Sequence, residues 1–197
     1  MSRMESVGLG GSRKWNPSTR GGPWHAYTAN EAHCDLVSIV TVVLNAVGTI
    51  SRTIESVAAQ NYSPVQHVVI DGGSTDGTLG VLREHEDTIC WVSGADAGIY
   101  DAMNKGVKLS AGNVIGIVNA DDYLLPEAIR RIKGFFDRGA DAVSGLRLLN
   151  GLRIEKRSYA IERLWNLESL PGHSAAFFVR RSVHERIGYY DLSYTVS

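Results

Sequence analysis

The feature that most restricts the fold is a repeated alternation of apolar runs with segments of helical spacing. The four runs are L-V-S-I-V-T-V-V-L (36–44), H-V-V-I (67–70), T-I-C-W-V (88–92) and V-I-G-I-V-N-A-D-D-Y-L (114–124). Runs this continuous suit strands that are covered on both faces. Strand–helix repeats imply parallel strands joined by right-handed crossovers. The sequence therefore predicts an α/β fold with a mostly parallel sheet flanked by helices.

Apolar positions spaced by three and four residues predict the helices between these strands. Thr49 is the expected N-cap of the first helix, Gly112 closes the third, and Pro126 begins the fourth. The residues expected on the apolar faces of the helices are Ile50, Ile54, Val57, Ala58, Leu79, Leu82, Ile99, Met103, Val107, Ile129, Ile132 and Phe136. Tyr100 is expected in the core as well.

The pattern changes after residue 141. Two runs, 142–149 and 152–159, flank Asn150-Gly151, which is a strong signal for a two-residue hairpin. A helix is expected near 161–167 and a strand near 174–179, so the parallel sheet gains an antiparallel addition. The basic residues of the hairpin predict a solvated strand face, with contact to a leaving diphosphate as the alternative; they are Arg147, Arg153, Lys156 and Arg157.

Residues 1–34 differ from the rest of the chain. They hold G-L-G-G-S, N-P-S-T-R-G-G-P and T-A-N-E-A-H without a hydrophobic period, which predicts a flexible leader ahead of a domain over 35–197. The G-L-G-G there is not a phosphate loop, because no strand precedes it and no helix follows.

Composition excludes several classes of protein. The chain has 197 residues, 44% of them hydrophobic and 21% charged, which suits one globular domain. A formal net charge of −1 provides no basic field for nucleic acid. No segment approaches the roughly 18 apolar residues of a membrane span, and the N-terminus lacks a signal-peptide pattern. Cys34 and Cys90 show no metal spacing and no disulfide framework, so we expect a cytoplasmic protein.

Acidic residues gather where the predicted strands end. Asp71 ends the second strand, Asp96 follows the third, and Asp121 and Asp122 end the fourth. The carboxyl ends of parallel strands meet at one edge, where α/β sheets bind ligands. Clustered carboxylates repel one another unless a cation neutralises them, and oxygen ligands with open positions suit Mg²⁺ or Mn²⁺ shared with a phosphate. This pattern predicts a nucleotide with a metal-bound pyrophosphate.

The loop after the second strand supports the same interpretation. The small residues of G-G-S-T-D-G allow the chain to approach a planar ring or a sugar closely. A simpler alternative exists for each acid. Asp71 and Asp121 would then cap the helices that follow them, and Asp76 is interpreted as a cap or a turn former.

Four motifs in this order resemble family 2 glycosyltransferases with the GT-A fold. They are V-S-I-V-T-V-V-L-N with S-V-A-A-Q, V-V-I-D-G-G-S-T-D-G-T, D-A-G-I-Y-D-A-M-N-K-G and N-A-D-D-Y-L-L-P. The last two are similar to members that build cell-surface polysaccharides and glycolipids. The resemblance covers residues 36–197 and implies a Rossmann-like sheet that binds a UDP-sugar.

The resemblance also implies roles for individual residues. Asp71 is expected to accept the N3–H of uracil, and Asp122 to be the direct ligand of Mg²⁺ or Mn²⁺. His173, in G-H-S-A-A-F-F-V-R-R, is expected beside the acceptor, with an ordinary loop residue as the alternative. The residues implied for the nucleotide and donor sugar are Val42, Val43, Leu44, Asn45, Asp71, Asp96, Gly98, Asn104 and Asp121.

The chain departs from the family pattern in three places. Ala97 stands where many relatives have Lys or Arg, and Leu44 replaces a frequent aromatic residue beside the base. The base that activates the acceptor is expected just after Ser197, beyond the stretch G-Y-Y-D-L-S-Y-T-V-S.

The function implied is inverting, metal-dependent transfer of a sugar from a UDP-sugar to a glycan or glycolipid acceptor. Contact with the inner face of a membrane stays open at this stage. The main alternative is a catalytically incomplete fragment or pseudoenzyme that binds UDP-sugar. A dinucleotide-binding oxidoreductase is disfavoured, because no G-x-G-x-x-G follows the first strand.

Overall fold

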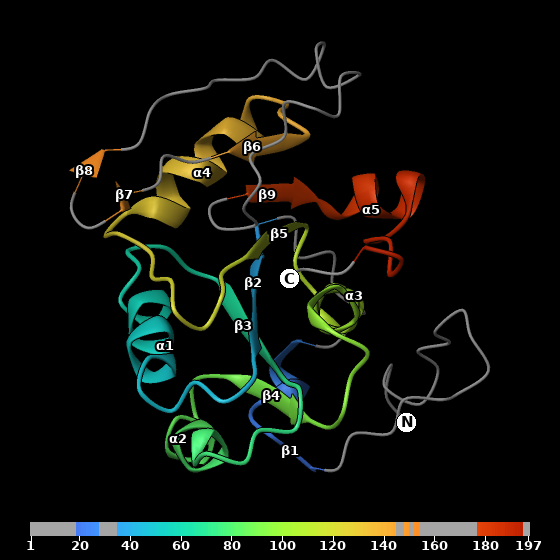
Figure 1. The fold of residues 1–197 in the computed structure, drawn as a ribbon. Helices are drawn as coiled ribbons and strands as arrows, with labels where there is room; N and C mark the ends of the chain where they lie inside the picture. Colours follow the sequence, from blue (N-terminus) through green and yellow to red (C-terminus); the bar gives the residue numbers. More distant parts are fainter. Residues whose placement is uncertain (1–18, 28–34, 145–147, 150–151, 154–176, 195–197) are drawn as a thin grey trace.

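The computed structural model describes residues 19–27, 35–144, 148–149, 152–153 and 177–194 (Figure 1). Its strands are β1 (Thr19–Gly21), β2 (Val37–Val43), β3 (Val65–Asp71), β4 (Cys90–Ser93), β5 (Val114–Ile117), β6 (Ala142–Ser144), β7 (Leu148–Leu149), β8 (Leu152–Arg153) and β9 (Phe177–Arg180). Its helices are the 3₁₀ helix η1 (Trp24–Tyr27), α1 (Ile50–Ala58), α2 (Thr78–Glu84), α3 (Ile99–Leu109), α4 (Ala128–Asp137) and α5 (Arg181–Ile187).

Seven strands form the main sheet in the order β1-β4-β3-β2-β5-β9-β6, and β4, β3, β2 and β5 run parallel. The chain passes outward from β2 to β3 and β4, and then returns to β5 on the other side of β2. The strand order therefore reverses between β2 and β5, the kind of switch point at which open α/β sheets bind ligands. The predicted mostly parallel sheet flanked by helices is confirmed.

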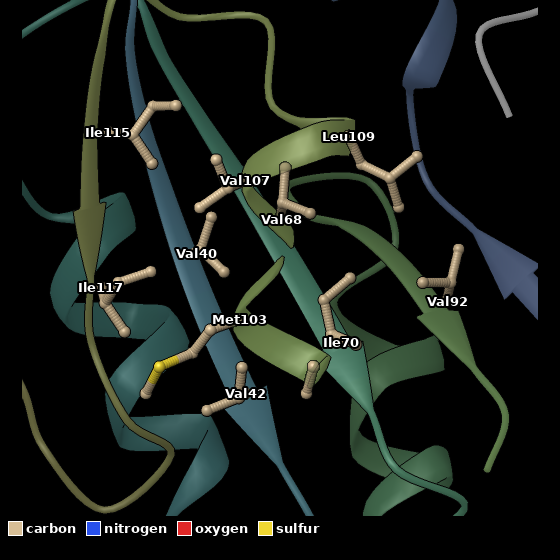
Figure 2. Close-up of a cluster of buried hydrophobic side chains, with 11 residues drawn as sticks. Val40, Val42, Val68, Ile70, Val92, Met103, Val107, Leu109, Ile115 and Ile117 are labelled. Atoms are coloured by element: carbon tan, nitrogen blue, oxygen red, sulfur yellow. The ribbon is translucent and has the colours of Figure 1, made fainter. Parts of the chain in front are cut away.

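Helices cover both faces of this sheet (Figure 1). The first face carries alternate residues of the central strands, among them Val40 and Val68, which pack with Met103 and Val107 of α3 (Figure 2). The opposite face packs against α1, α2 and α4 in two further clusters. The alternation of strand residues between two apolar layers explains why the strand runs are continuously hydrophobic.

Most of the predicted helical faces are buried. Ile50, Ile54 and Val57 of α1 are buried, and so is the predicted stripe of α4. Ala58 is exposed and was wrongly predicted to face the core. Ile99 is 38% exposed, because it stands at the first position of α3. Thr49 occupies the N-cap of α1, but its side chain makes no capping hydrogen bond.

The fourth predicted strand ends earlier than expected. β5 stops at Ile117, and only the Val118 N–H continues the ladder, donating to Val40 O at 2.9 Å. The chain then turns, since the Asp122 N–H donates to Asn119 O at 3.0 Å. Asp121 and Asp122 therefore lie in a loop beyond the strand and do not end it.

Two helix boundaries also differ from the prediction. α4 begins at Ala128 and not at Pro126, and its N-cap position is Glu127, with φ of 62°, so Asp121 does not cap it. α3 ends at Leu109, before Gly112. Gly112 has a packing role, because a Cβ there would lie 2.7 Å from Leu36 O and from the Ser38 hydroxyl.

Part of the predicted leader has regular structure. Thr19–Gly21 forms β1, which pairs antiparallel with β4 at the edge of the sheet, and η1 follows it. Gly21 allows this approach, since a Cβ there would lie 2.4 Å from the Trp91 indole nitrogen. Trp24 packs against the cluster beneath α3.

The antiparallel addition is present in a different arrangement. β7 and β8 pair across the predicted hairpin. The start of the predicted first arm, Ala142–Ser144, instead forms β6 in the main sheet beside β9, which covers the end of the strand predicted near 174–179. The helix predicted near 161–167 lies outside the described residues. In the part of the chain that is described, no helix is long and apolar enough to cross a membrane.

Candidate functional site

A cavity of about 590 Å³ lies at the switch point of the sheet, between the segments that follow β2 and β5. Its lining residues are Val42, Val43, Leu44, Asn45, Ala46, Val47, Gly48, Thr49, Asp76, Ile99, Asn119, Ala120 and Asp121. The four residues expected to line a base pocket, Val42 to Asn45, therefore all lie on this cavity. Asp121, from the segment that follows β5, lines it as well. The other expected site residues that lie within the described part of the chain are not among those that line it.

The cavity combines apolar and polar surface. Leu44, Val47 and Ile99 line it with side chains that are 60%, 45% and 38% exposed. Exposed aliphatic side chains of this kind offer contact to a flat apolar ring. Asp76, Asn119 and Asp121 supply polar groups on the same cavity. A pocket with apolar walls and a few polar groups is typical of small-molecule and cofactor sites.

Asp71 lies at the end of β3 with no exposed surface. Its Oδ2 accepts hydrogen bonds from the Gly73 and Ser74 N–H groups, each at 3.0 Å, and from the Ser93 hydroxyl at 2.6 Å. Its Oδ1 accepts from the Ser74 hydroxyl at 2.5 Å. Asp71 therefore organises the β3–α2 loop, residues 72–77, rather than capping α2, whose N-cap is Gly77.

Asp76 is a turn former, as predicted. Its Oδ1 accepts from the Thr78 N–H at 3.0 Å and from the Thr78 hydroxyl at 2.6 Å, while its Oδ2 accepts from the Val47 N–H at 3.0 Å. The Thr78 hydroxyl, followed by the Val47 amide, lowers the pKa of Asp76 below its ordinary value. The acid is therefore held in its charged form beside the loop that follows β2.

The β3–α2 loop also holds the segment after β2. Three consecutive amides of that segment donate to side chains of this loop or of the first residue of α2: Asn45 to the Ser74 hydroxyl at 2.7 Å, Ala46 to the Thr78 hydroxyl at 3.0 Å, and Val47 to Asp76. These contacts between the two loops were not predicted, because G-G-S-T-D-G was interpreted as space for a ligand. The alternation of Ser, Asp and Thr in the loop was the available signal, since these side chains bond readily to backbone groups.

Asp96 lies close to the start of the same loop. A Cβ on Gly72 would lie 2.8 Å from Asp96 Oδ2, so glycine leaves space for this carboxylate. Asp96 Oδ1 accepts from the Gly98 N–H at 2.9 Å. Gly98 is the N-cap of α3 and has φ of 113°, a left-handed conformation that favours glycine.

Asn104, expected along the ribose and donor-sugar side, contacts the segment after α5. It is 5% exposed, its side-chain N–H donates to Tyr190 O at 2.8 Å, and its Oδ1 accepts from the Tyr190 N–H at 2.9 Å. Both ends of the amide thus hold the segment after α5 against α3. Nothing in the local sequence of α3 indicates a partner 86 residues away.

The two adjacent aspartates occupy different surroundings. Asp121 is exposed and lines the cavity, while Asp122 is half-buried and is not among the lining residues. No group of three or more His, Cys, Asp or Glu side chains converges as metal ligands within the described ranges. Carboxylate oxygens are nevertheless suitable donors for Mg²⁺ or Mn²⁺, which often use one or two protein carboxylates together with substrate phosphates.

Side chains of α1 hold the loop that carries these acids, the β5–α4 loop of residues 118–127. The Thr53 hydroxyl contacts Ala120 O at 3.0 Å and Asp122 O at 2.6 Å, and the Ser56 hydroxyl accepts from the Leu124 N–H at 3.0 Å. Gln60 donates to Leu125 O at 3.0 Å. Thr53 and Ser56 belong to α1, while Gln60 follows the end of the helix at Ala58.

The residues expected near an acceptor are only partly described. His173 lies outside the described residues. Asp191 forms a turn, in which its Oδ1 accepts from the Ser193 N–H at 2.9 Å, and this contact lowers its pKa. Tyr190 stacks on Tyr100 with ring centroids 5.9 Å apart. Met103 is buried in the core, as predicted.

Comparison with known proteins identifies the family. Residues 38–190 match the model of glycosyl transferase family 2. The chain belongs to this family. It is 29% identical over 174 residues to an uncharacterised glycosyltransferase of Mycobacterium tuberculosis, and 30% identical over 176 residues to a PGL/p-HBAD biosynthesis glycosyltransferase of Mycobacterium bovis. Each alignment covers 82% of this chain but only 64% and 65% of those relatives.

Solved structures of other glycosyltransferases share the fold of this family 2 chain. Staphylococcus aureus TarS, residues 1–349, superposes with a TM-score of 0.68 at 18% identity, over 82% of this chain and 52% of TarS. TarS has been solved with UDP and with UDP-GlcNAc. The mannosyltransferase PcManGT of Pyrobaculum calidifontis, solved with GDP-Man and Mn²⁺, gives a TM-score of 0.62 at 19% identity, over 91% of this chain and 52% of PcManGT. The predicted GT-A fold is confirmed.

Proposed function

We propose that this family 2 chain binds a UDP-sugar in the cavity between β2 and β5 and takes part in transferring the sugar, with inversion, to a glycan or glycolipid acceptor. The observation that carries the proposal is the position of the cavity, which has Leu44 and Asn45 on one side and Asp121 on the other. Apolar surface for a base and an acid for a metal-bound diphosphate are thus brought to one site. The UDP and UDP-GlcNAc complexes of TarS support this choice of donor.

The base would lie against Val42 to Asn45, and Asp71 would accept the uracil N3–H. The four protein donors on Asp71 support this role, because they hold a carboxylate in one orientation at the end of β3. Asp96 and Gly98 would lie toward the ribose. Cytosine presents a lone pair at N3 where uracil presents a hydrogen, so the carboxylate favours uracil.

Asp122, supported by Asp121, would hold Mg²⁺ or Mn²⁺ against the diphosphate. The cation would neutralise charge on the departing UDP. The Mn²⁺ complex of PcManGT supports this assignment, as does the carboxylate character of the residues after β5. Inverting transfer also needs a general base on the acceptor hydroxyl. We propose, from the family resemblance, that His173 borders the acceptor. A glycolipid acceptor would bring the protein to the cytoplasmic face of a membrane.

The proposal is tested by titrating the chain with UDP in Mn²⁺ and again in EDTA. Asp122→Ala should fold like the wild type but bind UDP with the same affinity in Mn²⁺ and in EDTA. Replacing UDP by CDP should weaken binding about 10-fold or more, because a buried polar group left unpaired costs about 1–3 kcal/mol. Arg131→Ala, an exposed change on α4, is the control. Equal affinities for UDP and CDP, or an EDTA response retained by Asp122→Ala, would refute the corresponding assignment.

A further inference from the structure

A buried ion pair lies on α3, outside the residues assigned so far. Lys105 Nζ and Asp101 Oδ2 are 2.9 Å apart, one helical turn from each other, and their side chains are 1% and 10% exposed. Burying a lysine and an aspartate removes both from water, and such a pair is often no more stabilising than apolar residues of the same volume. Stability alone therefore does not account for this pair.

The pair reaches the loop that connects β4 to α3. Asp101 Oδ2 accepts from the Ala97 N–H at 2.9 Å, and Lys105 Nζ donates to Ala95 O at 3.4 Å. Ala95 and Ala97 are the neighbours of Asp96 on either side. The pair thus holds one backbone group before Asp96 and one backbone group after it.

The direction of the Asp96 side chain is constrained by two further contacts. Its Oδ1 accepts from the Gly98 N–H, and its Oδ2 faces the space that a Cβ on Gly72 would fill. A shift of the backbone at residues 95–97 would move the carboxylate away from Gly72 and from the end of β3. The ion pair thus restrains the backbone on either side of Asp96 in the chain, while Gly72 leaves space for its carboxylate.

We propose that Asp101 and Lys105 are positioning residues, which hold the peptides flanking Asp96 so that its carboxylate is oriented before the donor nucleotide binds. This inference rests on the proposed function, since Asp96 is assigned to the ribose side of the donor. Preorganisation of this kind raises affinity, because a loop that occupies its binding conformation only a tenth of the time weakens apparent binding tenfold.

The chain contains a matched control. Lys133 and Asp137 of α4 form another lysine–aspartate pair one helical turn apart, and the Lys133 side chain is 8% exposed. Lys133 also contacts Asp35 at 2.9 Å, at the start of the domain. Lys133 thus connects α4 to Asp35, just before β2, whereas Lys105 connects α3 to the β4–α3 loop. A change at Lys133 thus removes a similar pair without a connection to Asp96.

The experiment compares the 197-residue wild-type chain with Lys105→Met, Asp101→Asn and Lys133→Met. Urea unfolding measures stability, and calorimetric titration with UDP in Mn²⁺ measures the Kd. Lys105→Met should raise the Kd about tenfold. Asp101→Asn should raise it less, because the asparagine oxygen still accepts from the Ala97 N–H. Lys133→Met should lose stability with an unchanged Kd. An unchanged Kd in Lys105→Met, or an equal rise in Lys133→Met, would overturn the proposal.

Amide hydrogen exchange separates this inference from the proposed donor. In the protein without ligand, the Ala97 amide should exchange about tenfold faster in Lys105→Met than in the wild type, relative to amides of β3 in the same sample. If the wild type binds no UDP, the proposed function fails and the exchange rate alone decides the positioning role. If Lys105→Met does not fold, Asp101→Asn provides both measurements. An Ala97 amide that exchanges at the wild-type rate in the folded variant overturns the proposal.

Discussion

The β3–α2 loop and the β5–α4 loop lie on the same edge of the sheet, but they are held in different ways. In the first, Asp71 and Asp76 accept hydrogen bonds from groups two and three residues further along the chain. In the second, the contacts come from Thr53 and Ser56 of α1 and from Gln60, which follows the end of α1, between 65 and 69 residues away. One loop is largely organised by its own side chains, and the other by a helix.

This difference matters for what each loop can offer a ligand. Asp71 and Asp76 accept the hydrogen bonds that hold the β3–α2 loop in its conformation. Any role of these acids in binding a ligand would therefore be additional to this structural role. In the β5–α4 loop, α1 holds the backbone carbonyls of Ala120 and Asp122. The helix thus takes over the structural task there, and Asp121 remains exposed on the cavity. The comparison can be tested by removing the supports on each side.

The largest expected effect follows removal of Asp71. Asp71→Ala leaves the Gly73 and Ser74 amides and the Ser74 and Ser93 hydroxyls without their acceptor. Each buried polar group left unpaired costs about 1–3 kcal/mol, so we expect the free energy of unfolding to fall by more than about 3 kcal/mol. Urea unfolding measures it. Asp121→Ala, an exposed change on the other loop, should alter it by less than about 0.5 kcal/mol. Equal losses in the two variants would contradict the comparison.

The next effect concerns the support from Gln60, which follows the end of α1. Gln60→Leu leaves Leu125 O and the Ile129 N–H without the side chain that binds both, and the loss for the buried Ile129 N–H should cost about 1–3 kcal/mol. The β5–α4 loop should also lose its fixed position, so the Kd for UDP in Mn²⁺ should rise. Glu55→Ala, on the exposed side of α1, serves as the control. A Gln60→Leu protein with wild-type stability and wild-type UDP binding would show that Gln60 does not hold the loop.

A third difference lies in the strands that lead into the two loops. β3 carries His67, whose pKa burial lowers from 6.5 to about 3, whereas β5 (Val114–Ile117) carries no titratable side chain. Between about pH 6.5 and about pH 3, His67 is protonated in the unfolded chain but neutral in the folded protein. Stability should therefore fall by about 1.4 kcal/mol per pH unit as the pH drops through this window.

The test compares the wild type with His67→Gln by urea unfolding at pH 7 and pH 5. The wild type should lose about 2 kcal/mol more than the variant between these pH values. Glutamine keeps a polar partner for the Thr41 hydroxyl, which lies 2.9 Å from the His67 ring nitrogen. Identical pH dependence in the two proteins would mean that His67 is protonated in the folded state as readily as in the unfolded chain.

The smallest effect is expected for Ser56. Its hydroxyl donates to Thr53 O at 2.8 Å and accepts from the Leu124 N–H at 3.0 Å, in a half-buried position. Ser56→Ala should cost about 0.5–1.5 kcal/mol, the range of a single hydrogen bond, and should change UDP binding less than Gln60→Leu does. Hydrogen exchange of the Leu124 amide provides a direct check. A slower exchange in the variant than in the wild type would contradict the assigned contact.

The sequence was sufficient to predict the parallel sheet and most of the buried helix faces. The period of the hydrophobic residues is a local property of the chain, and it stays the same when the elements pack together. The sequence also predicted that residues 42–45 and Asp121 lie at one site, since parallel strands present their carboxyl ends at one edge of the sheet, and all of them line one cavity. Asp76 was predictable for a similar reason: an aspartate bonds to a backbone amide two residues further on. Each of these inferences depends on residues close together in the chain, or on a rule that applies to every sheet of this kind.

Other features were decided only by the tertiary structure. Asn104 binds the backbone of Tyr190, and Thr53 and Ser56 of α1 supply polar contacts to the β5–α4 loop. In each case a hydrogen-bonding group takes a partner from an element many residues away, and that partner exists only after the sheet and helices have packed. Local propensity and spacing do not indicate which distant backbone group will need a hydrogen-bond partner. That depends on which groups become buried when the chain folds.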